Sequence, residues 1–60
     1  NVMEELLKQL KELTESFNTN ATAQLENGNK AAGMRARKTS LEIEKLMKQF
    51  RKVSLKEAQK

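Results

Sequence analysis

The chain has 60 residues, 12 basic and 8 acidic side chains, a net charge of +4, and no Cys, His, Asp, Trp, Tyr or Pro. Without Cys and His there is no disulfide framework and no typical zinc ligand set, and only Glu, Lys and Ser remain for catalysis, so we predict neither an enzyme nor a metal or cofactor site. No apolar run approaches the roughly 18 residues that span a membrane, and no signal-peptide core is visible, which favours a cytoplasmic protein without a membrane or small-molecule partner.

The first segment has the apolar period of a helix. Apolar residues recur at spacings of three and four, with Leu7 and Leu25 flanking them, at Met3, Leu6, Leu10, Leu13, Phe17 and Ala21. This spacing places them on one stripe of a helix. The short polar residues over 18–22 weaken the helix locally because their side chains compete for backbone hydrogen bonds. We still expect it to extend over about 2–25.

A turn is predicted over 26–29. Gly28 tolerates the left-handed conformation that ends a helix, and the side-chain oxygen of Asn29 can cap the next one. The same unpaired amides, with the charge of Lys30 beside them, could bind a phosphate in addition to being capped. A connection this short makes the two helices antiparallel neighbours.

The second segment predicts a helix over about 30–57. It has an unbroken three-four alternation, with Met47 beside it, at Ala32, Ala36, Thr39, Ile43, Leu46, Phe50 and Val53. We call this set, together with the first helix's stripe, the seam. The fold class is therefore all-α: one domain over 1–60, folded as an antiparallel two-helix hairpin. Because a core of this size supplies only about 3–5 kcal/mol, we expect the hairpin to dimerise, into a four-helix bundle.

Charge divides at the turn. Up to Gly28 there are two basic and five acidic residues, a sum of −3, and from Asn29 onward ten basic and three acidic residues, a sum of +7. Such an asymmetry indicates a polyanionic partner, of which nucleic acid is the commonest.

The basic side chains of the second helix project away from the seam over about 25 residues, which is roughly 37 Å at 1.5 Å per residue. The predicted DNA-binding residues are Lys30, Arg35, Arg37, Lys38, Lys45, Lys48, Arg51, Lys52 and Lys56. Arg35, Arg51 and Lys60 lie at the margins of this face. For Arg35 the alternative is a salt bridge to a Glu of the first helix, and for the whole face it is a solvated surface without a ligand.

Met34, Leu41 and Leu55 interrupt the basic face at heptad spacing. A hairpin alone does not explain them. Either a second packing contact covers them, or they are isolated surface apolar residues of the kind found on most proteins.

The second half also has a specific order of residues. It contains Gly28-Asn29-Lys30-Ala31-Ala32, Arg35, Arg37, Ser40, Glu44-Lys45, Lys48, Phe50-Arg51-Lys52 and Ser54. This pattern resembles the characteristic block of the bacterial linker-histone-like family, the chlamydial type of small basic nucleoid protein. The resemblance implies DNA binding and compaction in the nucleoid, without enzymatic activity. It also implies that this block takes part in self-association, and that the chain is a short member lacking the Lys/Ala/Pro-rich tail of longer ones.

We interpret the chain as a module that holds double-stranded DNA by its phosphates. No third helix of a helix-turn-helix and no aromatic platform is visible, which predicts binding without sequence preference. The principal alternative is a helical oligomerisation module that pairs with another, acidic protein. A less favoured one is an amphipathic helix at an anionic membrane surface.

Overall fold

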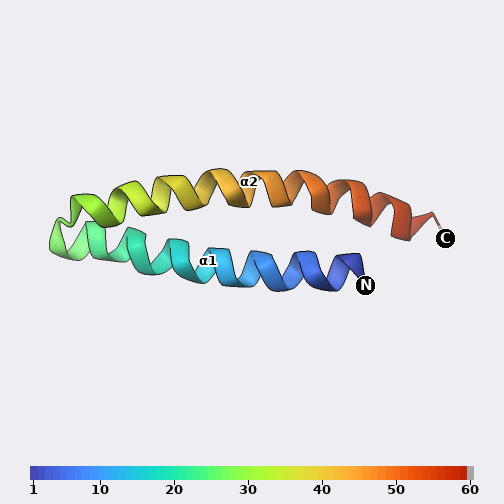
Figure 1. Cartoon of the computed structure of the whole chain (residues 1–60), viewed down its shortest axis with the longest axis horizontal. Coiled ribbons are helices and arrows are strands. Elements are labelled where there is room, and N and C mark those ends of the chain that lie inside the picture. The colour runs from blue at the N-terminus through green and yellow to red at the C-terminus, as the bar shows by residue number, and fades with distance from the viewer. Residues whose placement is uncertain (60) are drawn as a thin grey trace.

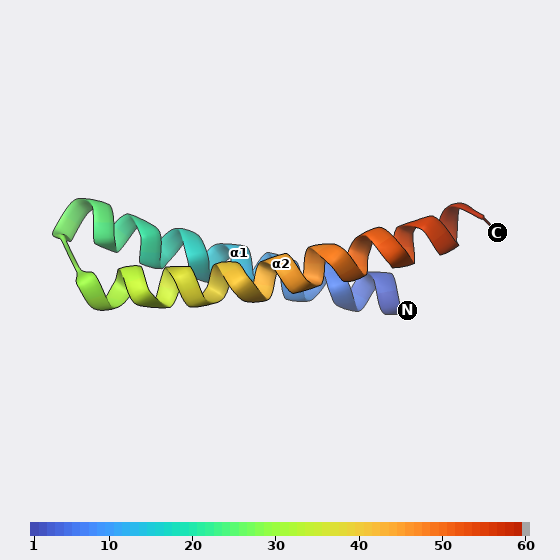
Figure 2. The ribbon, with the colours of Figure 1, turned by 90° about the horizontal axis from the view of Figure 1, so that it is seen from above.

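The computed structural model describes residues 1–59, which form two helices, α1 (Val2–Asn27) and α2 (Lys30–Ala58). They lie side by side in opposite directions, and the C-terminal end of α2 extends past the start of α1 (Figures 1 and 2). The rod measures 48 × 15 × 12 Å, and the described residues contain no strand. This confirms the all-α, antiparallel two-helix hairpin. Neither helix has the length and hydropathy that a transmembrane span requires.

The turn consists of Gly28 and Asn29 alone. α1 continues to Asn27 rather than ending near Leu25, because helical bonding persists until the residue that adopts a left-handed conformation, Gly28, at φ 63° and ψ 27°. The Gly28 N–H donates to the Gln24 carbonyl at 3.0 Å, and Asn29 Oδ1 accepts from the Ala32 N–H at 3.1 Å. Both capping roles expected for this pair are confirmed.

Polar side chains in the second half of α1 form hydrogen bonds with the backbone of their own helix. Thr19 Oγ1 donates to the Glu15 carbonyl and Asn20 Nδ2 to the Ser16 carbonyl, each at 3.0 Å. These bonds satisfy the side chains without removing a backbone donor from the helix. The helix therefore passes unbroken through the segment where its propensity is lowest.

Packing along the seam is uneven. Leu6 and Leu10 are 6% and 9% exposed, and Ala32 and Ala36 are also buried. The rest of the seam is half-buried: Met3, Leu13, Phe17, Ala21, Thr39, Ile43, Leu46, Phe50 and Val53. The predicted seam is thus confirmed as the contact between the helices, yet most of its large side chains keep part of their surface in water.

Gly33 is a buried position that the apolar period does not identify. A Cβ built on it would lie 2.6 Å from the Cδ and Oε1 of Gln24. Any larger residue here would require the end of the exposed Gln24 side chain to move away from α2. This contact adds to the close approach that Ala32 and Ala36 allow beside the turn.

Candidate nucleic-acid interface

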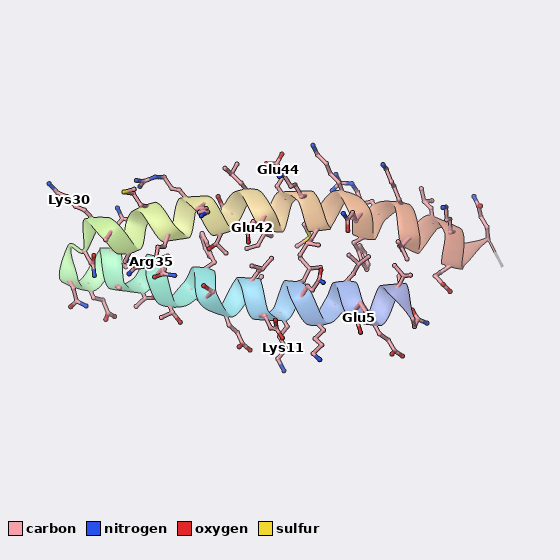
Figure 3. The ribbon with its side chains drawn as sticks, in the orientation of Figure 1. Glu5, Lys11, Lys30, Arg35, Glu42 and Glu44 are labelled. Carbon is pink, nitrogen blue, oxygen red and sulfur yellow. The ribbon has the colours of Figure 1, made fainter. Side chains whose placement is uncertain are left out.

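All nine basic residues predicted to bind DNA lie on α2 and are exposed. We call them the basic strip. Because Ala32, Ala36, Ile43 and the other seam residues face α1, a helix of 3.6 residues per turn directs most of the strip to the opposite side. Figure 3 shows Lys30 pointing away from α1. From Lys30 to Lys56 the strip extends about 39 Å, at 1.5 Å per residue. Lys60 lies outside the described residues.

Arg35 is a member of the strip that hydrogen-bonds to the other helix. Its Nε donates to Asn20 Oδ1 at 3.0 Å, and Figure 3 shows it between α1 and α2. The bond differs from the alternative considered for this residue, a salt bridge to a Glu of the first helix, because an amide oxygen receives it. A guanidinium has five N–H donors, so this bond still leaves donors for a phosphate at the margin of the strip.

Acidic side chains do little to neutralise the strip. Glu44 points outward beside it (Figure 3) and forms an i,i+4 pair with Lys48, at 4.0 Å between Oε1 and Nζ. Both side chains are largely exposed, and exposed pairs of this kind interact weakly. The face therefore keeps a strong positive potential toward solvent.

The opposite side of the rod has the opposite sign. Lys11 points away from α2 (Figure 3), and Lys8 is its only basic companion on α1. Five exposed carboxylates accompany them, at Glu4, Glu5, Glu12, Glu15 and Glu26. A polyanion is consequently attracted to the α2 side and repelled from the α1 side.

Large apolar side chains remain uncovered on both helices. Met34, Leu41 and Leu55 are exposed within the basic strip, and no other part of the described hairpin covers them. Leu7, which flanks the seam on α1, and Met47, beside the seam on α2, are about half exposed. The sequence indicates the first set, and one copy of the hairpin leaves these side chains in water.

Residues 1–59 contain no group of three or more His, Cys, Asp or Glu side chains placed to hold a metal ion, and their surface has no pocket. Ser40, one of the possible nucleophiles, donates to the Arg37 carbonyl at 2.6 Å, as expected for a helical serine. The exposed feature with clear binding chemistry is the basic strip.

Comparison with known proteins identifies a family. A family model described as histone H1-like protein Hc1 matches residues 4–60. The match contains every residue of the basic strip and nearly all of both helices. No curated protein and no solved structure matches the chain.

Proposed function

Since the chain belongs to the histone H1-like Hc1 family, we propose that it binds double-stranded DNA through the basic strip, without sequence preference, and compacts DNA in the bacterial nucleoid. A histone H1-like family is a family of structural DNA-binding proteins rather than enzymes. The nucleoid location and the compaction are parts of this proposal. The observation that supports it most is an exposed strip of cations that lies mostly on the helix face that packing leaves free.

The arrangement of the other side chains favours phosphate contact over base recognition. Phe17 and Phe50, the two aromatic residues, belong to the half-buried seam, so neither forms a platform on which bases could stack. Lysine and arginine contacts to phosphates position a protein on DNA without distinguishing sequences.

The test of this proposal is equilibrium binding to duplexes of equal length and unrelated sequence. We expect random, A·T-rich and G·C-rich duplexes to bind within a few-fold of one another at one salt concentration, because the phosphates are the same in each. Fluorescence anisotropy with labelled duplexes measures the three affinities. A hundredfold preference for one duplex would contradict the proposal and indicate recognition of bases or of DNA shape.

Self-association is a second part of the proposal. Leu13, Ile43, Leu46 and Phe50 are only half-buried in one hairpin, and a hairpin of this size has little other means of stabilisation. Packing a second copy against the seam, as a four-helix bundle, would cover these side chains. Mutual repulsion would keep the two basic strips on the outside, where DNA can reach them.

We expect the chain to be a dimer or larger at low micromolar concentration, and Phe50→Ala to weaken the assembly because it removes a large side chain from the surface that a second copy would cover. Light scattering combined with size-exclusion chromatography measures the mass. Leu25→Ala, at an exposed position near the turn, is the matched control and should leave the mass unchanged. A well-folded monomer at this concentration would contradict self-association.

A further inference from the structure

The outer face of α2 contains a short internal repeat. Arg-Lys-x-Ser-Leu occurs at 37–41 and again at 51–55. The copies are two heptads apart, so their leucines, Leu41 and Leu55, lie on the same face at a separation of about 21 Å. Both leucines are exposed, at 61% and 64%, and both lie within the basic strip.

Cations surround each leucine. Residues three and four positions apart are neighbours on a helix surface, so Leu41 lies beside Arg37, Lys38 and Lys45. By the same spacing Leu55 lies beside Arg51 and Lys52. All five of these cations are exposed. The serine of the first copy already bonds to its own helix, which leaves one apolar side chain and its flanking cations as the part of each repeat that faces solvent.

An exposed leucine flanked by cations restricts the kind of partner that can bind this face. A second copy docking with the same face would bring two basic strips together, which charge repulsion opposes. An anionic membrane needs a broad apolar face to enter, whereas here the apolar line is one residue wide. The DNA major groove has the matching arrangement: base edges with thymine methyl groups lie between two rows of phosphates.

The dimensions agree with this groove. An α-helix with its side chains is about 10–12 Å in diameter, and the major groove is about 12 Å wide against about 6 Å for the minor groove. A straight helix cannot follow a groove that winds around the duplex. The two copies of the repeat, about 21 Å apart, would therefore contact the groove at separate points.

We propose that each Arg-Lys-x-Ser-Leu copy is a major-groove contact unit. In it Leu41 or Leu55 contacts thymine methyl groups, while the neighbouring Arg and Lys side chains hold the phosphate rows on either side. This inference rests on the proposed function and adds the groove and the chemical group contacted. Such apolar contacts add affinity for A·T pairs that is small beside the phosphate term, so binding remains broadly independent of sequence.

The test combines variants of the protein with a variant of the DNA. L41A and L55A should each weaken binding to an A·T-rich duplex about twofold, and the double variant about fourfold, which stays within the few-fold range expected among duplexes of different sequence. The slope of log K against log salt should stay unchanged, because an apolar contact releases no counterions. L25A is the matched control, since it truncates an exposed leucine on α1, and circular dichroism verifies that each variant is helical.

The DNA variant replaces every thymine by uracil, which removes the methyl group and keeps pairing and charge. We expect the wild-type chain to bind this duplex several-fold more weakly and the double variant to be indifferent to the change. Wild-type binding by the double variant, or indifference of the wild-type chain to uracil, overturns the inference while leaving phosphate binding intact. The inference is also overturned if the double variant binds DNA like the wild-type chain but no longer binds anionic vesicles. If the wild-type chain does not bind DNA at all, the proposed function itself is wrong.

Discussion

Replacement of Arg37, Lys45, Lys48 and Lys52 by Glu is expected to abolish DNA binding while the chain stays helical. The four changes convert the net charge from +4 to −4 and place carboxylates where phosphates would lie. All four positions are exposed and outside the seam, where substitutions usually change stability little. Anisotropy titration measures the binding, and circular dichroism measures the helix content.

A matched control separates position from net charge. Two double variants change the net charge equally. One carries Lys45→Glu and Lys48→Glu on α2, within the basic strip, and the other carries Lys8→Glu and Lys11→Glu on α1, outside it. We expect the α2 pair to weaken binding far more than the α1 pair. If the fourfold variant binds DNA at wild-type strength, the strip is a solvated face, and a helical module that pairs with another protein becomes the better interpretation.

Leu10→Ala is expected to unfold most of the protein at room temperature. Leu10 is 9% exposed, and truncating a buried leucine costs about 2–5 kcal/mol. A core of this size supplies only about 3–5 kcal/mol in total, so a single truncation removes most of the stability. Thermal and urea unfolding followed by circular dichroism measure the loss.

The control for this change is Leu25→Ala, because Leu25 is 85% exposed and its truncation leaves no cavity. We expect it to unfold within a few degrees of the wild-type chain. A Leu10→Ala variant with the wild-type midpoint would show that the contact between α1 and α2 does not hold the hairpin together.

The sequence predicts the architecture well because the hairpin is built from local signals. The three-four apolar period places the seam on both helices, Gly28 supplies the left-handed turn residue, and Asn29 caps α2, each as expected. The exact end of α1 is less predictable. Short polar residues lower helix propensity, but here the Thr19 hydroxyl and the Asn20 amide nitrogen donate to carbonyls of their own helix.

Contacts that depend on the approach of the two helices are not visible in the sequence. Gly33 is buried because the Gln24 side chain lies against it, and Arg35 bonds to the Asn20 amide rather than to a carboxylate. Neither contact follows from the period of one helix, since each depends on the register between the two. A glycine one position after the seam residue Ala32 is the one sequence signal that could have indicated the first contact.

The sequence predicts the location and exposure of the basic face better than it predicts which residues contact a ligand. The charge division at the turn and the helical phase predict an exposed basic face, and every residue of the strip is exposed. The family resemblance, which rests on the order and spacing of residues between Gly28 and Ser54, is confirmed by the match over residues 4–60. Which of these cations touch DNA depends on the complex, so their individual roles stay predictions.

The most direct test of phosphate binding is the affinity for one duplex across a series of salt concentrations. If each dimer neutralises about four to eight phosphates, log K should fall with log salt at a slope of roughly −4 to −7, from about −0.9 per phosphate. Fluorescence anisotropy at constant temperature and duplex length gives the slope. A steep slope in this range is the result we predict, and a slope near zero would contradict binding through the basic strip.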